Sequence, residues 1–245
     1  MNSGPWFVAP RSNWGESRIT LDAGESHHAL KVLRVAVDDI IAVSDGRGSV
    51  ARCAVDRVDG GTVGAAILET AHHPRRVPEL VVYQAAGKAN KADGVIERLS
   101  ELGAAEVWVY ESMRSVVRWD DAKRGRLERR WQSIARSAAK QSRNPWMVDT
   151  SAPLAWPELV ARVAAEPLAA VLWEEASLPL RSALAEPAGR VALVVGPEGG
   201  LDRGEAEALA GAGARLVSLG PMILRTENAP LVAASVVLYH YGLIG

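Results

Sequence analysis

The sequence predicts an α/β protein in two parts, a small β-barrel over residues 1–73 and a larger domain with a mostly parallel sheet over residues 74–245. The first part holds short apolar runs and one helical pattern, as small barrels do. The second alternates strand and helix patterns, which is typical of a parallel sheet covered on both faces. Between them, His73–Pro78 contains two prolines. Because proline cannot donate to a sheet ladder, neither flanking strand continues through this segment.

The barrel strands are predicted from apolar runs that end at turn residues. Asp45-Gly46-Arg47-Gly48 and Asp59-Gly60-Gly61 are the strongest turns. One helix is predicted from Ser26, whose hydroxyl can cap it. The apolar side of this helix would consist of Ala29, Leu30, Leu33 and Val37. The predicted strands are Trp6–Val8, Arg18–Leu21, Ile40–Ser44, Ser49–Val58 and Val63–Thr70.

The second part is predicted from alternating short apolar runs and longer segments with apolar residues at helical spacing. The strands are expected at Leu80–Ala85, Glu106–Tyr110, Ala169–Trp173, Arg190–Val195 and Arg215–Leu219. The helices are expected at Ala92–Leu102, Asp121–Ser142, Trp156–Ala165, Arg203–Gly211 and Ala229–Tyr241. Strands that alternate with helices in this way predict a doubly covered sheet with loops at the carboxyl ends of its strands.

Composition narrows the class of protein. With 245 residues, of which 48% are hydrophobic and 23% charged, the chain can bury a sizeable core. A single cysteine, Cys53, excludes an internal disulfide framework and a cysteine zinc cluster, and it fits a reducing compartment. Residues 1–10 lack the pattern of a signal peptide, and the most apolar stretch, 229–245, is too short to span a bilayer. We therefore expect a cytoplasmic protein that makes no use of a membrane.

Charge is distributed unevenly along the chain. The net charge is −1, but residues 114–143 hold ten basic and three acidic residues. A basic band in a neutral protein is typical of a surface that docks on phosphates, although a solvated helix face gives the same pattern.

A glycine-rich loop follows the predicted strand Arg190–Val195. It reads Gly196-Pro197-Glu198-Gly199-Gly200 and precedes a helix, so it should lie at the carboxyl end of the sheet, where ligands bind. Its glycines allow close approach to the backbone. The spacing fits neither a dinucleotide fingerprint nor a phosphate-binding P-loop. A plain strand-to-helix turn is the alternative.

A second loop, Leu219-Gly220-Pro221-Met222-Ile223-Leu224-Arg225-Thr226-Glu227, also lies between a strand and a helix. Arg225 follows two apolar residues, so we expect it to be partly buried and paired with Glu198 or Glu227. Such a pair can be a structural ion pair or part of a catalytic site.

Together, the two loops closely resemble the knot motifs of the SPOUT methyltransferases, and above all those of the ribosomal RNA small subunit methyltransferase E family. The resemblance extends over nearly the whole chain. Two differences are Asn228-Ala229-Pro230, where the family has Thr-Ala after Arg-Thr-Glu, and Asn144-Pro145-Trp146. Further matching segments are His27-His28-Ala29-Leu30, Val32-Leu33-Arg34, Asp45-Gly46-Arg47-Gly48, Glu101-Leu102-Gly103, Arg114-Ser115-Val116 and Ala138-Ala139-Lys140-Gln141-Ser142-Arg143.

The resemblance implies a PUA-like N-terminal barrel that binds RNA and a SPOUT domain with a deep trefoil knot at about residues 193–230. It implies methylation of N3 of a uridine in 16S rRNA, for which the family target is uridine 1498. The cofactor would be S-adenosylmethionine. The partners would be 16S rRNA or the small ribosomal subunit and a second copy of the chain, with no metal.

The resemblance also implies roles for particular residues. The catalytic residues would be Arg225, Glu198 and Glu227; either carboxylate could take the proton from N3 or orient the arginine. The cofactor would contact Leu172, Val195, Gly196, Pro197, Gly199, Gly200, Leu219, Gly220, Ile223, Leu224 and Arg225. The RNA would contact His27, His28, Arg34, Arg114, Arg118 and Arg143.

The histidines and tryptophans give further predictions. His27 and His28 can equally be an ordinary exposed helix start, and no carboxylate or cysteine cluster accompanies them as a metal site would require. Of the eight tryptophans, we expect Trp108, Trp131 and Trp173 to lie in the core.

Two other classes of function remain possible from sequence alone. The chain could be a non-catalytic RNA-binding factor in ribosome assembly with an idle pocket, which titration with S-adenosylmethionine would reveal. It could also be a nucleotide-dependent metabolic enzyme, but the segment 87–91, the only early candidate for a phosphate loop, lacks the required spacing.

Overall fold

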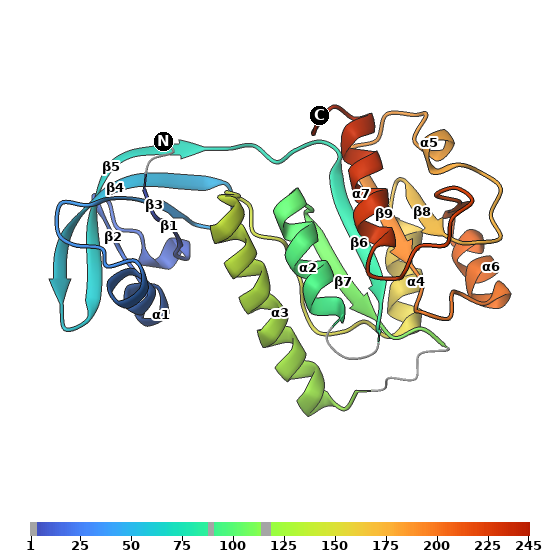
Figure 1. The fold of residues 1–245 in the computed structure, drawn as a ribbon, viewed down its shortest axis with the longest axis horizontal. Coiled ribbons are helices and arrows are strands. Elements are labelled where there is room, and N and C mark those ends of the chain that lie inside the picture. The colour runs from blue at the N-terminus through green and yellow to red at the C-terminus, as the bar shows by residue number, and fades with distance from the viewer. Residues whose placement is uncertain (1–3, 88–90, 114–118) are drawn as a thin grey trace. The chain divides into compact units, whose positions relative to one another are not determined.

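The computed structural model describes residues 4–87, 91–113 and 119–245. The chain divides into two compact units (Figure 1). The first comprises residues 1–75 together with 136–147, and the second comprises residues 76–135 and 148–245. Each unit has its own sheet and its own hydrophobic core. The division passes through the long helix α3 (Asp121–Ser142), so its last turns belong to the first unit.

The first unit is built on one sheet with the strand order β1-β3-β4-β5-β2. β1 and β3 are parallel, and the other neighbours are antiparallel. The long strands β4 and β5 form a hairpin that turns at Gly60 and Gly61, both with positive φ, as the turn residues predicted. The strands are β1 (Trp6–Val8), β2 (Arg18–Thr20), β3 (Ile40–Ser44), β4 (Ser49–Asp59) and β5 (Thr62–His72).

The helix of this unit begins earlier than predicted. α1 (Ala23–His27) is capped by Asp22, whose carboxylate accepts a hydrogen bond of 2.8 Å from the Glu25 amide. The prediction that Ser26 caps the helix is wrong. Ser26 is fully buried, and its hydroxyl donates to the carbonyl of Leu21 instead.

The expected apolar side of that helix is also partly wrong. α1 continues into one π-turn (His28–Val32), and the chain then leaves the helix at Arg34, which has a φ of 56°. Leu33 and Val37 therefore lie outside the core, with 42% and 50% of their surface exposed, whereas Ala29 is buried. A short 3-10 turn, Arg11–Asn13, was not predicted either.

Residues 144–147 pack against the turn of the β3–β4 hairpin. The Gly48 amide donates to the carbonyl of Pro145, and the indole N–H of Trp146 donates to the carbonyl of His73. A Cβ on Gly48, which has a φ of 96°, would lie 2.6 Å from the Trp146 ring. Glycine is therefore required at this position.

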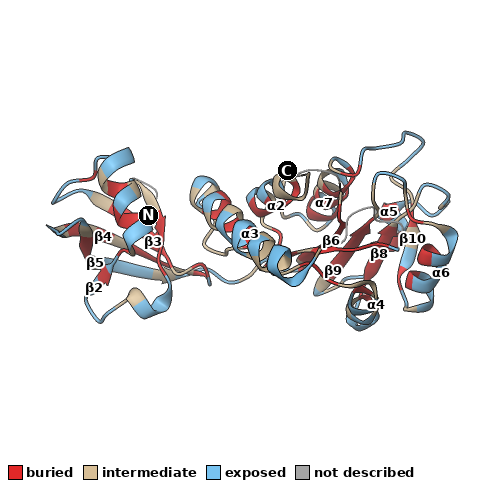
Figure 2. Cartoon of the chain, turned by 90° about the horizontal axis from the view of Figure 1, so that it is seen from below, coloured by how far each residue is buried: buried red, intermediate tan, exposed pale blue. Residues whose placement is uncertain are grey.

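The second unit contains a fully parallel sheet with the order β10-β8-β9-β6-β7. Its strands are β6 (Glu79–Ala85), β7 (Glu106–Tyr110), β8 (Ala169–Leu172), β9 (Arg190–Val195) and β10 (Arg215–Val217). The central strands β8, β9 and β6 are almost entirely buried (Figure 2). Continuous apolar runs predicted this, because a sheet covered on both faces has no solvent side.

Helices cover both faces of this sheet. α2 and α7 pack against each other on one face, and α4 lies on the other (Figure 2). The helices are α2 (Lys91–Leu102), α3, α4 (Trp156–Ala165), α5 (Leu180–Ala183), α6 (Arg203–Gly211) and α7 (Ala229–His240). The one-turn helix α5 was not predicted. In the described part of the chain, no helix is both long and apolar enough to cross a membrane.

Candidate functional site

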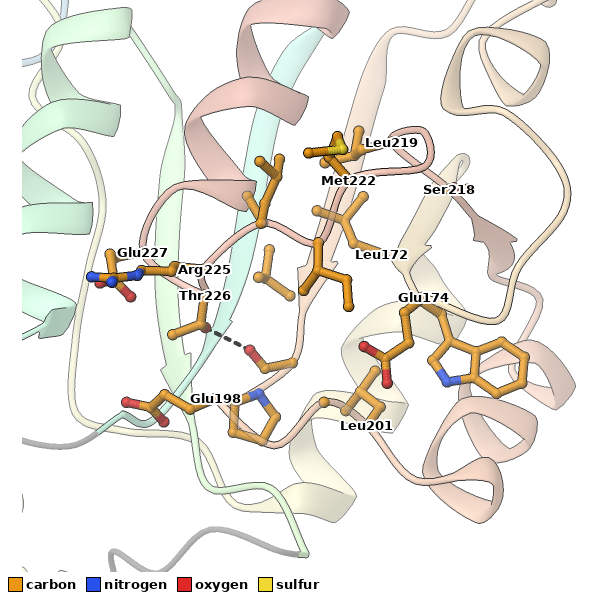
Figure 3. A pocket seen from close by; sticks show the side chains of 18 of the residues that line it. Leu172, Glu174, Glu198, Leu201, Ser218, Leu219, Met222, Arg225, Thr226 and Glu227 are labelled. Atoms are coloured by element: carbon orange, nitrogen blue, oxygen red, sulfur yellow. Dashed lines mark hydrogen bonds between the residues drawn. The ribbon is translucent and has the colours of Figure 1, made fainter.

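A cavity of about 530 Å³ opens at the carboxyl ends of β8, β9 and β10 (Figure 3). Both loops singled out in the sequence line it, the glycine-rich loop after β9 and the arginine-bearing loop after β10. Parallel strands end at the same edge of a sheet, so loops distant in sequence meet there. Of the residues expected to contact a cofactor, all but Gly199 line the cavity. Other lining residues that were not predicted include Lys91, Trp173, Glu174, Leu201, Ser218, Met222 and Thr226.

The glycine-rich loop turns tightly into α6. A Cβ on Gly196 would lie 3.0 Å from the side chain of Leu201 and 3.1 Å from its amide nitrogen, so the residue has to be small. Gly200 has a φ of 72°, the left-handed region that glycine tolerates. Asp202 then caps α6 in a reciprocal capping box with Glu205. The backbone at the cavity wall is therefore fixed from both ends.

A buried hydrogen-bond chain joins the two loops. The hydroxyl of Thr226 donates to the carbonyl of Gly196 at 2.7 Å (Figure 3). The same hydroxyl accepts a hydrogen bond of 2.9 Å from the side-chain amide of Gln84, at the end of β6. Thr226 and Gln84 are 7% and 3% exposed. Sequence reasoning missed both; the only hint was a glutamine within an otherwise apolar strand.

The charged residues of the cavity are arranged differently from the prediction. Arg225 was expected to be partly buried and paired with a carboxylate, and this is wrong, because its side chain is exposed. Among the described residues, Arg225 makes no side-chain hydrogen bond or ion pair. Lys91, at the start of α2, occupies the expected place, 3.3 Å from Glu198 and 3.1 Å from Glu227. Nothing in the sequence links Lys91 to loops more than 100 residues away.

The ion pairs change the proton affinities of these groups. A hydrogen bond from its own backbone amide, followed by one from Lys91, lowers the pKa of Glu227 below its usual value, and Arg225 contributes in the same direction. Hydrogen bonds to Glu227 and Glu198 raise the pKa of Lys91. At neutral pH, Lys91 is thus a cation and Glu227 an anion.

Comparison with known proteins identifies the family. Residues 74–238 match the model of an RNA methyltransferase domain, and residues 21–67 match that of an RNA methyltransferase PUA domain. The chain is 38% identical to ribosomal RNA small subunit methyltransferase E of Mycobacterium bovis over 221 residues, which cover 89% of this chain and 84% of that protein. The chain belongs to the ribosomal RNA small subunit methyltransferase E family.

Other members of the methyltransferase E family show the same relationship. The Bacillus subtilis protein is 35% identical over 232 residues, covering 90% of this chain and 89% of that protein. The structure of the Neisseria gonorrhoeae protein, solved with S-adenosyl methionine bound, aligns with a TM-score of 0.86 and 26% identity over 96% of this chain and 97% of that one. The mixed α/β fold with a parallel sheet and an N-terminal PUA-like domain is therefore the family fold.

None of the described residues that the family resemblance assigned to RNA lines the cavity. His27 and Arg34 are exposed in the first unit, and His28 is half-buried with its ring 6.4 Å from that of Phe7. Arg143 is exposed, with a φ of 53°, in the same unit. Arg114 and Arg118 lie outside the described residues.

Several basic residues of the band at residues 114–143 form ion pairs within the protein. Arg130 and Arg124 form ion pairs with Asp93 and Glu111 in the second unit. In the first unit, Arg136 and Lys140 bind acidic residues at the start of α1: Arg136 pairs with Asp22 and Glu25, and Lys140 with Glu25. The exposed basic residues of α3 without such an ion pair in the described residues are Lys123, Arg126 and Arg129.

The tryptophans, the potential metal ligands and the single cysteine bear on which other functions the protein could have. Trp131 is buried, as predicted. The prediction that Trp108 and Trp173 lie in the core is only partly right, because both are half-buried and pack against the core of the second unit from outside. Within residues 4–87, 91–113 and 119–245, no group of three or more His, Cys, Asp or Glu side chains is placed to hold a metal ion. Burial raises the pKa of Cys53 to about 12, so its thiol is unreactive at neutral pH.

Proposed function

We propose that this protein transfers a methyl group from S-adenosylmethionine to N3 of a uridine in 16S rRNA, the family target being uridine 1498. One observation carries the proposal: two strand-end loops close on a single cavity, and Glu198, Arg225 and Glu227 lie together on one side of it (Figure 3).

The cavity fits this cofactor. Its volume lies within the usual range of small-molecule sites, roughly 300–1,000 Å³. Glycine backbone at Gly196 and Gly200 gives a flat ligand close access to main-chain donors and acceptors. Apolar side chains provide surface for an adenine ring. The proposed cofactor contacts are Leu172, Val195, Gly196, Pro197, Gly200, Leu219, Gly220, Ile223, Leu224 and Arg225.

The charged groups suit the chemistry at uridine N3. The bound cofactor supplies an electrophilic methyl group, and alignment of the nucleophile with it is a proximity effect. N3 carries a weakly acidic proton, and its loss spreads negative charge onto the neighbouring carbonyl oxygens. Arg225 is exposed and makes no side-chain hydrogen bond or ion pair among the described residues, so its guanidinium can stabilise that charge.

Lys91 gives the carboxylates distinct roles in this proposal. Because the pKa of Glu227 is lowered, Glu227 is a weak base, and we assign it to orientation. Glu198 is the proposed proton acceptor. Lys91 holds both carboxylates, so Arg225 remains available to the substrate.

The target base must be unpaired or extruded, because N3 lies on the Watson–Crick edge. We propose that exposed basic residues hold the RNA backbone around it. In the second unit these are Lys123, Arg126 and Arg129 of α3, with Arg114 and Arg118 assigned by family resemblance alone. In the N-terminal domain, proposed as residues 1–73, they are His27 and Arg34, together with the half-buried His28. Arg143 is the remaining candidate.

We also propose a homodimer and a knot. Large apolar side chains are exposed on the second loop and on α7: Met222, Ile223, Val232 and Tyr239. Large apolar side chains that are exposed in a monomer are typical of an interface when they lie together. A knot over about residues 193–230, within a methyltransferase domain of residues 74–245, is supported by the path of the chain. β10 is the last strand in the sequence and lies at one edge of the sheet. The loop that follows it returns past β8, so that Thr226 binds the carbonyl of Gly196, the residue directly after β9.

Mass mapping of 16S rRNA from a strain that lacks this gene tests the activity. The expected result is the loss of one methyl group on one uridine, restored by the wild-type gene and not by Arg225→Ala. An unchanged methylation map would contradict the proposal and favour the non-catalytic assembly factor.

A further inference from the structure

Glu174 is a charged residue of the cavity that the proposed chemistry does not use. It follows β8 by two residues and is exposed in the lining of the cavity. Its carboxylate points into the cavity beside Leu201 (Figure 3). Within the described residues it makes no hydrogen bond or ion pair. The neighbouring Glu175, by contrast, pairs with Arg203 at 3.1 Å and does not line the cavity.

The surroundings of Glu174 are those of a ligand contact. A Cβ on Gly200 would lie 3.4 Å from the Glu174 carboxylate, so this side chain packs against the glycine-rich loop. Apolar residues Leu172, Val195 and Leu201 also line the cavity. A ligand that fills the cavity removes water from the carboxylate, which must then receive hydrogen bonds from the ligand itself.

The position of Glu174 indicates which part of the ligand it meets. Glu198, Arg225 and Glu227 lie on one side of the cavity, and Glu174 lies on the opposite side (Figure 3). The methyl-donating end of the cofactor has to face the catalytic side chains. The nucleoside end then faces Glu174. At that end, the hydrogen-bond donors are the exocyclic amino group of the adenine and the two vicinal ribose hydroxyls. Only the diol offers two donors on neighbouring carbons, which match the two oxygens of one carboxylate.

We infer that Glu174 is a cofactor-recognition residue whose two carboxylate oxygens accept hydrogen bonds from the 2′- and 3′-hydroxyls of the cofactor ribose, an inference that rests on the proposed function. In dinucleotide-binding sheets, a carboxylate likewise accepts a hydrogen bond from the ribose 2′-hydroxyl. The contact is charge-assisted and bidentate, which makes it selective for an intact diol.

Calorimetric titration of the full-length protein tests this inference. The ligands are S-adenosylhomocysteine, its 2′-deoxy and 3′-deoxy analogues, and S-adenosylmethionine. The proteins are wild type, Glu174→Gln and the matched control Glu175→Gln. Wild type should bind each deoxy analogue about 10- to 100-fold more weakly than S-adenosylhomocysteine. Glu174→Gln should bind S-adenosylhomocysteine about tenfold more weakly than wild type and discriminate less against the deoxy analogues. Glu175→Gln should match wild type.

Other outcomes overturn the inference in recognisable ways. If wild type binds S-adenosylhomocysteine and both deoxy analogues with equal affinity, no carboxylate accepts hydrogen bonds from the ribose hydroxyls. A Glu174→Gln variant that loses affinity for S-adenosylmethionine but not for S-adenosylhomocysteine would place the carboxylate against the sulfonium. Failure of the wild-type protein to bind any of these ligands would overturn the proposed function as well.

Discussion

Replacing Thr226 by valine removes the hydroxyl that joins the two loops and changes almost nothing else in shape. The hydroxyl donates to the carbonyl of Gly196 and accepts from Gln84. In the variant, that carbonyl loses its donor at the half-buried wall of the cavity. Gln84 keeps one partner, because its amide also donates to the carbonyl of Ala85 at 3.2 Å.

The structure sets the size of the expected loss. The variant loses two hydrogen bonds, one of them to a half-buried carbonyl, and this costs about 2 kcal/mol of unfolding free energy. For a protein of this size that corresponds to a fall in Tm of roughly 4–8 °C. Loops that are no longer joined should also bind S-adenosylhomocysteine more weakly, because binding must then order them.

Differential scanning calorimetry and titration with S-adenosylhomocysteine measure the two effects. Thr226→Ser keeps the hydroxyl and serves as the matched control, with a smaller loss from one missing methyl group. If Thr226→Val keeps both the Tm and the affinity of wild type, the hydrogen-bond chain does not hold the loops together, and the reasoning fails.

Three further predictions follow from the same contacts. Lys91→Met removes a cation that lowers the pKa of Glu227, so Glu227 should protonate at higher pH in the variant. Because the proposed reaction needs Glu227 ionised, the acid limb of the kcat/KM profile should move to higher pH, and Lys91→Arg should restore it. An unmoved limb would exclude Lys91 from the mechanism. Arg225→Ala should abolish methyl transfer with an unchanged Tm, because the side chain is exposed; a large fall in Tm would indicate a structural role. Gly48→Ala should lower the unfolding free energy of the first unit by more than about 1 kcal/mol in urea, because the new Cβ would collide with Trp146. Gly60→Ala, the matched control, should cost less, because Gly60 also has a positive φ but a Cβ there would meet no other atom.

Local patterns predicted most of the second unit. The apolar run before the glycine-rich segment predicted β9, the turn and α6. These elements could be predicted because each depends on residues that are close in sequence. Family resemblance then joined this loop to the one that bears Arg225. The one-turn helix α5 (Leu180–Ala183) is too short for periodicity to reveal.

The ion pairs of the site could not be predicted, because they depend on distant segments. The partner of Glu198 and Glu227 is Lys91, which reaches them only once α2 has packed beside α7. Apolar neighbours in sequence made Arg225 look buried, yet those neighbours are themselves exposed on the loop: Ile223 is 85% exposed. Apolar side chains indicate burial only when something covers them.

The same limit applies at the start of α1. Both Ser26 and Asp22 are good capping residues, and sequence spacing alone favoured the serine next to the apolar run. Long-range packing decides between them, since the Ser26 hydroxyl accepts from the amide of Val63 in β5.

Transfer of a labelled methyl group by the purified protein tests the central claim most directly. Small ribosomal subunits from a strain without the gene serve as acceptor and S-adenosylmethionine as donor, and the labelled nucleoside is identified by mass spectrometry. We expect about one methyl group per subunit, on uridine N3, with inhibition by S-adenosylhomocysteine. Cofactor binding without transfer, or label on a ribose hydroxyl or another base, would contradict the account.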